Sequence, residues 1–470
     1  MKQYLLGIFS IIGFLGWGQT EAWDLNKCVE YALDNNIQIQ QSEINQDLSK
    51  QNLIQDRAAL LPDLNGVASH NYNIGQRIDP FTNTFASNRV QSNNFYISSN
   101  FLVFNGLQQF NSIKKSELDY EASEKDAEQQ RNDIILAIVN AYLQVLFTEE
   151  IYNTTLSQLE VTEQQVKRTA NLVEVGSLAR GSLLDIESQL ASEELALVNA
   201  ENNRDLAYLN LAQLLLLDPA TFKIVKPQLE VPAEPLLNQN PMDIAESAIQ
   251  NQANIQAADL RIQSAEKSLA IARGARSPRL SFSYSYGTGY SGAARTPIGT
   301  PIPTFDTVGF TATSYESVVI PGFTSDYKTT PFVDQLDQNL NRSYGFNLSV
   351  PIFNKWQVQT NVNRAKLNVE MAQLNKELLE NSVSQNIQQS YYDAKAAFKK
   401  YNATMKAVGA LKESFKYTQE RFNVGMVNTI DFNDGKNKLL KAESDLLQAK
   451  YEYIFKLKIL DYYKGTPLSL

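Results

Sequence analysis

The chain has 470 residues, a formal net charge of -9, one cysteine and one histidine. Cys/His metal sites and Ser-His-Asp or Cys-His catalysis need more of these residues than the chain supplies, so an enzyme, a metal site or a bound cofactor is not expected. The lone cysteine excludes an intramolecular disulfide, and the acidic balance argues against a nucleic-acid partner.

Residues 1–20 are predicted to form a secretory signal peptide. They contain a lysine near the start and an apolar run from Leu5 to about Trp17, followed by small and polar residues. Cleavage is expected between Gly18 and Ala22, so the mature chain is expected to leave the cytoplasm. Beyond this segment no window of about 18 uninterrupted apolar residues exists, and no transmembrane helix is expected.

The mature sequence is predicted to be a tandem duplication. ALDNNIQIQ near its start matches AIQNQANIQ 216 residues later, whereas FLVFNG matches VPIFNK at an offset of 249, so the second copy holds 33 extra residues. We assign a first repeat to 23–217, a proline-rich linker that cannot continue a helix to 218–241, and a second repeat to 242–467. Each repeat is expected to contain a helix, two strands and a long helical hairpin.

Two segments in each repeat are predicted to be β-strands. Apolar side chains alternate with Ser, Asn or Gly, as in SYGFNLSVPIF, and a period of two gives a strand with one apolar face. Strands of about ten residues have the length that crosses a bilayer at a tilt. The expected strands are about 63–75, 93–104, 279–290 and 342–353.

Four strands cannot close a β-barrel. An open sheet edge in lipid leaves backbone groups unpaired, at a cost of several kcal/mol each, so the chain is expected to oligomerise. Two copies give eight strands with a largely filled interior, whereas three give twelve and leave room for a channel.

A long helical hairpin is predicted after the strands of each repeat. The ranges 81–218 and 352–466 contain no proline, and their apolar residues recur at spacings of three and four. The first helix of each hairpin is expected to run for about 70 residues, on the order of 100 Å. It should end just before Gly176 in the first repeat and Gly425 in the second.

The segment from Gly287 to about Asn341 is rich in Gly, Thr, Ser and Pro and holds the excess length of the second repeat. We expect a strand-to-strand connection on the outer side of the membrane, where barrel loops are long. Gly287, Gly289 and Gly292 spell GxGxxG, but no helix pattern follows, so nucleotide binding is not expected. The single histidine, His70, is expected to be an incidental barrel or loop residue.

The order and spacing of these features resemble the TolC-like outer-membrane efflux proteins. The features are the duplicated helix, strand, strand, helix order, prolines at strand entry (Pro62, Pro278), Phe-Asn signatures (Phe104, Phe353) and Val-Gly motifs (Gly176, Gly425). The resemblance covers about 23–467. It implies a mixed α/β membrane protein, a homotrimer with a twelve-stranded β-barrel in outer-membrane lipid and a twelve-helix tunnel in the periplasm. It also implies docking of a periplasmic adaptor protein and export driven by an inner-membrane pump.

The resemblance places the helix turns at the periplasmic end of the tunnel and assigns its aperture to Asp431 and Asp434, with Ser182 and Asp185 as their equivalents in the first repeat. In a trimer the aspartates would form stacked acidic rings that favour cations. The alternative is that Asp431 caps the helix that follows, and both roles are compatible. A basic residue that some members carry two positions after the glycine is replaced by Val427, so the resemblance does not extend to a gate latch built on it.

The resemblance also assigns adaptor contact to the tip motifs, which are Val175, Gly176, Val424 and Gly425. The structural alternative is that the glycines simply let the helix reverse.

The expected function is a passive outer-membrane channel of a tripartite efflux or type I secretion system. The alternative is a soluble periplasmic coiled-coil tether or adaptor-like scaffold. An adaptor would carry compact β domains around one helical hairpin, whereas this chain has two predicted hairpins and paired alternating strands.

Overall fold

The structure, a computed structural model, describes residues 22–79, 81–86, 89–219, 222–227, 231 and 240–466. The predicted signal peptide, much of the proline-rich linker and the last residue of the second repeat lie outside these residues. The described chain forms two compact units. The helical unit contains residues up to Lys50, Leu118–Gln263 and Glu370 onward, and the strand unit contains Gln51–Glu117 and Ser264–Val369. Each unit therefore takes segments from both predicted repeats.

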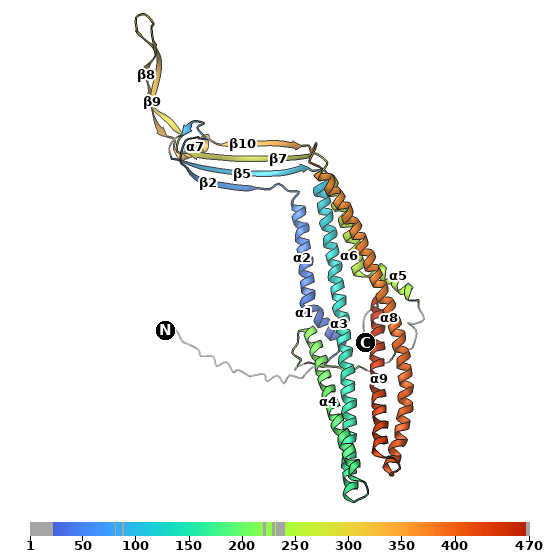
Figure 1. The fold of residues 1–470 in the computed structure, drawn as a ribbon. Coiled ribbons are helices and arrows are strands. Elements are labelled where there is room, and N and C mark those ends of the chain that lie inside the picture. Colours follow the sequence, from blue (N-terminus) through green and yellow to red (C-terminus); the bar gives the residue numbers. More distant parts are fainter. Residues whose placement is uncertain are drawn as a thin grey trace, which may run out of the picture. The chain divides into compact units, whose positions relative to one another are not determined.

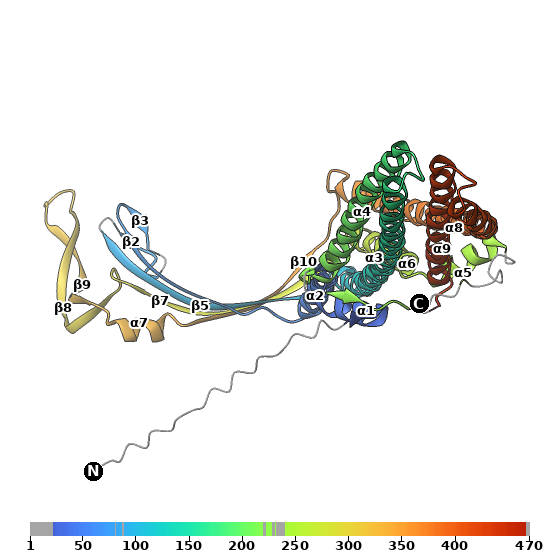
Figure 2. The ribbon, with the colours of Figure 1, turned by 90° about the horizontal axis from the view of Figure 1, so that it is seen from below.

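Long antiparallel helices form the helical unit, and several of them begin or end in the strand unit. The first helices of the two hairpins, α3 and α8, each have 67 residues. Each lies side by side with the helix that follows it, α4 or α9 (Figures 1 and 2). The helices are α1 (Leu25–Asn35), α2 (Ile37–Ala58), α3 (Gln108–Glu174), α4 (Arg180–Leu215), α5 (Pro241–Asn251), α6 (Ala253–Gly274), α8 (Gln357–Asn423) and α9 (Thr429–Tyr463).

The single helix expected at the start of each repeat is two helices, broken at Asn36 and at Gln252. Asn36 has an extended backbone (φ -69°, ψ 126°) between α1 and α2. Its side-chain oxygen accepts a hydrogen bond from the Gln38 N–H (2.9 Å), and its side-chain nitrogen donates to the Leu214 carbonyl (3.2 Å). Gln252 is extended in the same way between α5 and α6 (φ -69°, ψ 133°). At Asn36 the side chain starts the next helix by capping its first turn, so the chain changes direction there.

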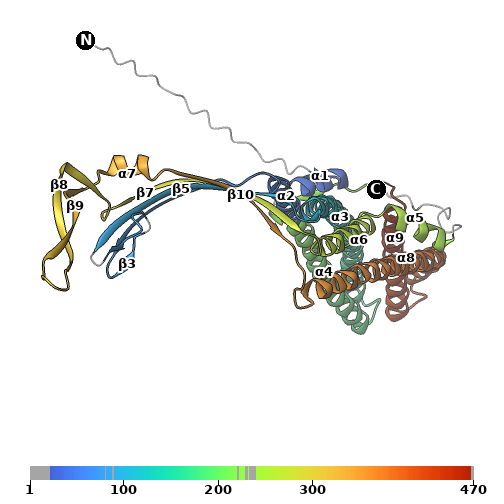
Figure 3. The same ribbon diagram turned by 90° about the horizontal axis from the view of Figure 1, so that it is seen from above.

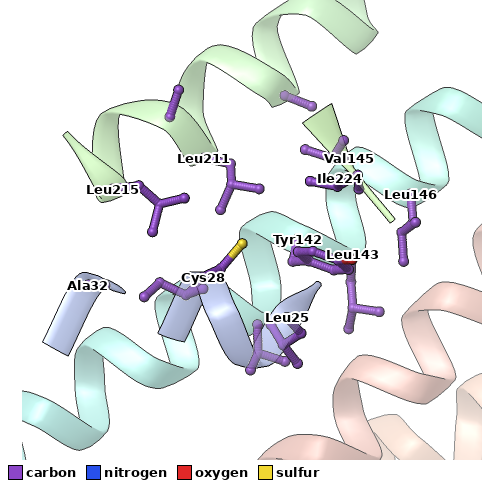
Figure 4. Packing of buried hydrophobic residues seen from close by; sticks show 14 of the residues in the cluster. Leu25, Cys28, Ala32, Tyr142, Leu143, Val145, Leu146, Leu211, Leu215 and Ile224 are labelled. Carbon is purple, nitrogen blue, oxygen red and sulfur yellow. The ribbon is translucent and has the colours of Figure 1, made fainter. Parts of the chain in front are cut away.

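A buried apolar cluster joins α1, α3 and α4 in the helical unit (Figure 4). Cys28 of α1 is fully buried between Leu211 and Leu215 of α4 and Tyr142 of α3. Burial, helped by the charge of Asp24, raises the pKa of Cys28 to about 12, so its thiol stays protonated and unreactive. The Tyr142 hydroxyl donates to a backbone carbonyl 2.6 Å away, so the polar group buried in this cluster is satisfied.

One helix in the described part of the chain, α3, contains an 18-residue window that is apolar enough to cross a membrane by length and composition. No such helix was expected from the sequence. Most of the apolar residues of α3 from Ile134 to Leu146 belong to the buried cluster or pack against it. A core helix passes the same test, and 44% of the window is buried, so packing inside the helical unit accounts for part of this hydropathy.

The strand unit contains a four-stranded antiparallel sheet in the order β10-β7-β5-β2. Its strands are β2 (Asn65–Asn73), β5 (Val90–Phe104), β7 (Arg279–Ser291) and β10 (Asn341–Ser349). They occupy the four predicted ranges, although β10 ends before Pro351, which has no amide hydrogen for the ladder. The sheet is a single curved layer (Figures 2 and 3). Its outer strands, β2 and β10, have no further partner strand among the described residues.

The sheet has one apolar face and one polar face. Phe101, Phe282 and Phe346 lie opposite one another on β5, β7 and β10, and the rings of the last two are 5.1 Å apart. The adjacent row, on the other face, consists of Asn100, Ser283 and Gly345. The predicted alternation of apolar and polar residues is therefore present in three dimensions.

Two further strand pairs are short. In the strand unit β3 (Arg77–Ile78) pairs with β4 (Phe85–Ala86), and in the helical unit β1 (Ala22–Trp23) pairs in parallel with β6 (Lys223–Ile224). His70 lies on β2 with its Nδ1 2.6 Å from the Asn93 side-chain oxygen.

The connection between β7 and β10 has regular structure that the sequence did not predict. It contains an antiparallel two-stranded ribbon of β8 (Arg295–Phe310) and β9 (Ser317–Thr329), followed by the short helix α7 (Phe332–Gln338). Gly287 and Gly289 lie within β7, where a side chain at either would collide with β5, and at Gly289 also with the Phe81 ring. Close strand packing therefore explains these two glycines of the GxGxxG pattern.

Candidate functional site at the hairpin tips

The two hairpin turns are built in the same way. A glycine with a left-handed backbone follows each long helix, Gly176 (φ 75°) after α3 and Gly425 (φ 76°) after α8. The Ser177 N–H donates to the Leu172 carbonyl at 2.8 Å, and the equivalent bond in the second turn is 2.9 Å long. This helix-ending motif needs a residue that adopts positive φ without strain, which explains the glycine of each Val-Gly motif.

Asn428 directly precedes the helix α9, and its side-chain oxygen accepts a hydrogen bond from the Asp431 N–H at 2.8 Å. The alternative in which Asp431 is itself the cap is therefore wrong. Asparagine has the geometry to cap because it lies just outside the helix, whereas Asp431 is the third helical residue. A carboxylate there still faces the positive end of the helix dipole, which favours its negative charge.

The four predicted aperture residues lie in the first two turns of α4 and α9. Asp431 and Asp185 are exposed, and Ser182 is half-buried. Asp434 is also exposed and forms a 2.6 Å ion pair with Lys438, one turn further along α9. No hydrogen bond or ion pair joins these four side chains to one another within the described chain.

A hollow of about 460 Å³ lies between the two tips. Ser182 and Gly425, both predicted site residues, line it, whereas Val175 and Val424 project from the tips with exposed fractions of 73% and 70%. Arg168 of α3 also lines the hollow. Its guanidinium donates to the side-chain oxygen of Asn423 (2.6 Å) and to the carbonyl of the same residue (3.2 Å), which joins the two hairpins.

A buried ion pair above the tips also joins the hairpins and was not anticipated from the sequence. Lys436 of α9 lies 2.8 and 2.9 Å from the two carboxylate oxygens of Glu193 of α4. Both are buried, and Lys436 also donates to the Gln158 carbonyl (3.0 Å) and to the Thr162 hydroxyl of α3. Burial lowers the pKa of Lys436, although the hydrogen bond and charge of Glu193 oppose this effect. The buried pair and its hydrogen bonds therefore connect the three helices α3, α4 and α9.

A signal for this pair is present in the sequence. Phe432, Lys436 and Leu439 follow the spacing of one buried helix face, and all three are buried. A lysine within an apolar stripe needs a buried acceptor or acid. Among the described residues, no group of three or more His, Cys, Asp or Glu side chains is placed to hold a metal ion.

Comparison with known proteins gives one consistent result. The family model for outer membrane efflux proteins matches residues 28–215 and again 244–460. The outer membrane protein TolC of Escherichia coli (strain K12) is 24% identical over 465 residues, which cover 96% of this chain and 83% of TolC. The crystal structure of the Campylobacter jejuni CmeC outer membrane channel matches with a TM-score of 0.74 at 19% identity, covering 94% of this chain and 85% of CmeC. The Vibrio cholerae VceC structure matches with the same TM-score at 16% identity, covering 95% and 97%.

Proposed function

The chain belongs to the outer membrane efflux protein family and is an outer-membrane channel of tripartite efflux systems, and we propose that three copies assemble to form one passive channel. The trimer spans the outer membrane as a β-barrel and continues into the periplasm as a helical tunnel. A periplasmic adaptor protein joins it to an inner-membrane pump, which supplies the energy for export, and the chain itself performs no catalysis.

The four-stranded sheet is the observation that carries this proposal. Its outer strands, β2 and β10, are unpaired within the described chain, and unpaired backbone groups in lipid cost several kcal/mol each. Pairing β10 of one copy with β2 of the next satisfies both edges, and three copies give twelve strands around a channel. The face with Phe101, Phe282 and Phe346 then contacts lipid, and the Asn, Ser and Gly face lines the water-filled interior.

The exposed acids at the hairpin tips support a role as the channel's selective aperture. Three copies of Asp431 and Asp434 give rings of fixed negative charge at one end of the tunnel, and such rings attract cations. In the first repeat, Ser182 and Asp185 contribute a weaker ring with less negative charge.

The exposed valines beside the turn glycines support a role in adaptor contact. Val175 and Val424 are apolar, largely exposed and held at the ends of rigid helical hairpins. Gly176 and Gly425 keep each turn tight enough for a partner to approach closely.

A pair of neighbouring lysine substitutions in β10 tests the membrane assignment. Phe346→Lys puts a charge on the proposed lipid face, which costs about 2–4 kcal/mol near the bilayer midplane, whereas Asn347→Lys puts the same charge into the water-filled interior. We expect Phe346→Lys to reduce trimers extracted from the outer membrane and Asn347→Lys to leave them unchanged. The measurements are native mass in detergent and conductance in a planar bilayer.

The tether alternative makes the opposite prediction. A soluble coiled-coil scaffold would purify without detergent, would show no conductance, and would respond alike to both lysine substitutions. An exposed fraction of 71% at Phe346, on a sheet face with an apolar row, argues against this alternative because soluble proteins cover such faces.

A further inference from the structure

The β8–β9 ribbon leaves the sheet from a rigid, buried root. Gln335 of α7 accepts a hydrogen bond from the Ser291 N–H (2.8 Å) and donates to the carbonyls of Ser291 (3.0 Å) and Thr330 (2.8 Å). The Ser291 hydroxyl donates to the Asp79 carboxylate (2.6 Å), and all four side chains are buried. The ribbon therefore has a fixed point of departure from β7.

The two faces of the ribbon differ in character. Residues directly opposite each other in the ladder share a face. One face has Pro303 opposite Phe323, Phe305 opposite Pro321 and Thr307 opposite Val319. The other has Ile302 opposite Thr324, Thr304 opposite Gly322 and Asp306 opposite Ile320. We call Pro303, Phe305, Val319, Pro321 and Phe323 the apolar ribbon face, and no charged residue interrupts it.

The apolar ribbon face is uncovered in the single chain. Phe305 and Phe323 have exposed fractions of 71% and 74%. A two-stranded ribbon is marginally stable alone in water, and a contiguous exposed apolar patch usually marks an interaction surface. We therefore expect an apolar surface of another chain to cover this face.

The prolines of the ribbon disfavour pairing of another strand along its edges, which leaves its face as the contact surface. Pro297 and Pro303 lie in β8, and Pro321 lies in β9. Proline has no amide hydrogen, so within a paired strand it fits where its nitrogen points away from the partner strand. At such a position the outer edge of the ribbon lacks one backbone hydrogen-bond donor. An additional strand would find neither edge fully able to bond with it.

Continuity with the open edge of the sheet identifies the partner. The ribbon returns through α7, whose Phe332 ring lies 5.3 Å from that of Tyr290 on β7, and the chain then enters β10. In the proposed trimer β10 pairs with the neighbouring copy, so three ribbons rise from the same rim. We propose that the apolar ribbon faces of neighbouring copies pack against one another at the outer mouth of the channel. This inference rests on the proposed trimer.

The packed ribbons narrow the outer exit. Each ribbon occupies space above the rim that a solute leaving the channel must pass. Loss of the packing frees the ribbons to separate, so the expected result is a higher conductance and easier entry of large solutes from outside.

Cysteine cross-linking in the purified trimer tests the packing directly. The natural Cys28 is buried and protonated, so an introduced cysteine is the only reactive thiol expected in the described chain. Phe305→Cys and Phe323→Cys place a thiol on the apolar ribbon face, and Asp306→Cys and Thr324→Cys place one next to it on the opposite face. With a short bis-maleimide, we expect the first pair to yield covalently joined chains several-fold more efficiently than the second.

A conductance comparison provides a second readout with a matched control. Phe305→Ser/Phe323→Ser should raise single-channel conductance. Ile302→Ser/Ile320→Ser removes similarly exposed apolar side chains from the opposite face and should leave conductance unchanged.

The outcomes separate this inference from the proposed function. Trimers that conduct but cross-link equally from both faces, or from neither, would overturn the ribbon packing and leave the channel intact. The ribbon packing would also be overturned if these cysteines formed cross-links to a different surface protein in cells and formed none in the purified trimer. Absence of trimers or of any conductance in the unsubstituted protein would instead contradict the proposed function.

Discussion

Lys436 is a residue whose role depends on contacts far away in the sequence. Its partners Glu193 and Thr162 lie 243 and 274 positions earlier. The pair connects α9 to α3 and α4, so it couples the two hairpins near their tips. Removing one member of such a pair leaves the other charge buried without compensation.

Lys436→Met is therefore expected to destabilise the helical unit by about 3–5 kcal/mol. The double variant Lys436→Met/Glu193→Gln should recover most of this loss, because the neutral amide keeps hydrogen-bonding capacity without a buried charge. Helix unfolding followed by circular dichroism in detergent measures both.

Lys438→Met is the control for this prediction. Lys438 also pairs with an acid, but both side chains are more than half exposed, and exposed pairs contribute about 0–1 kcal/mol. Equal loss of stability in Lys436→Met and Lys438→Met would show that the buried pair has no special role.

At the residue scale, the sequence predicted the parts of the site that depend on local geometry. The turn glycines Gly176 and Gly425 were predicted because a helix reversal needs positive φ. Lys436 was not, because its acceptors come from helices whose register only the fold reveals. Capping by Asp431 was the alternative to its predicted aperture role, but Asn428 lies three residues nearer the turn and is the cap.

At the element scale, Gly409 inside α8 and Gly425 in the turn after it allow the effect of backbone strain to be distinguished from that of side-chain packing. A Cβ at Gly425 or at Gly409 would meet no atom within 4 Å, but only Gly425 has positive φ. Gly425→Ala is expected to destabilise by about 1–2 kcal/mol, the cost of the left-handed conformation for an L-residue. Gly409→Ala lies inside α8 and is expected to stabilise by about 0.5–1 kcal/mol.

Thermal unfolding of both glycine variants checks this pair of predictions. Opposite shifts in midpoint temperature are the expected result. A stabilising Gly425→Ala would mean that the turn adopts another conformation in solution.

The long helices and the ribbon show what sequence patterns can and cannot reveal about elements. The helices α3 and α8 were predicted because long proline-free runs with three-and-four spacing fit little else. The ribbon was missed because Pro297, Pro303 and Pro321 interrupt the strand pattern, and proline within a run argues against a strand. The breaks at Asn36 and Gln252 were missed because single polar residues within a helical pattern rarely end a helix.

At the scale of the whole molecule, the two halves are similar in their elements and different in their charge. α1 and α5 have 11 residues each, α2 and α6 have 22, and α3 and α8 have 67. The second half adds the ribbon at one end. At the hairpin tips it carries Asp431 and Asp434 where the first half has Ser182 and Asp185. At these two pairs of equivalent positions, the second hairpin therefore carries two carboxylates and the first carries one.

That asymmetry makes the paired aspartates the test of selectivity in the trimer. Asp431→Asn/Asp434→Asn removes six charges from the proposed rings, and we expect a clear loss of cation preference, measured as the reversal potential across a salt gradient. Glu160→Gln/Glu163→Gln removes the same number from exposed positions on α3 and should preserve that preference. Loss of the Asp431 charge at the helix start should cost only about 0.3–1 kcal/mol of stability. If stability falls while the reversal potential stays unchanged, the aspartates only stabilise the start of helix α9, and the aperture must select solutes by its width.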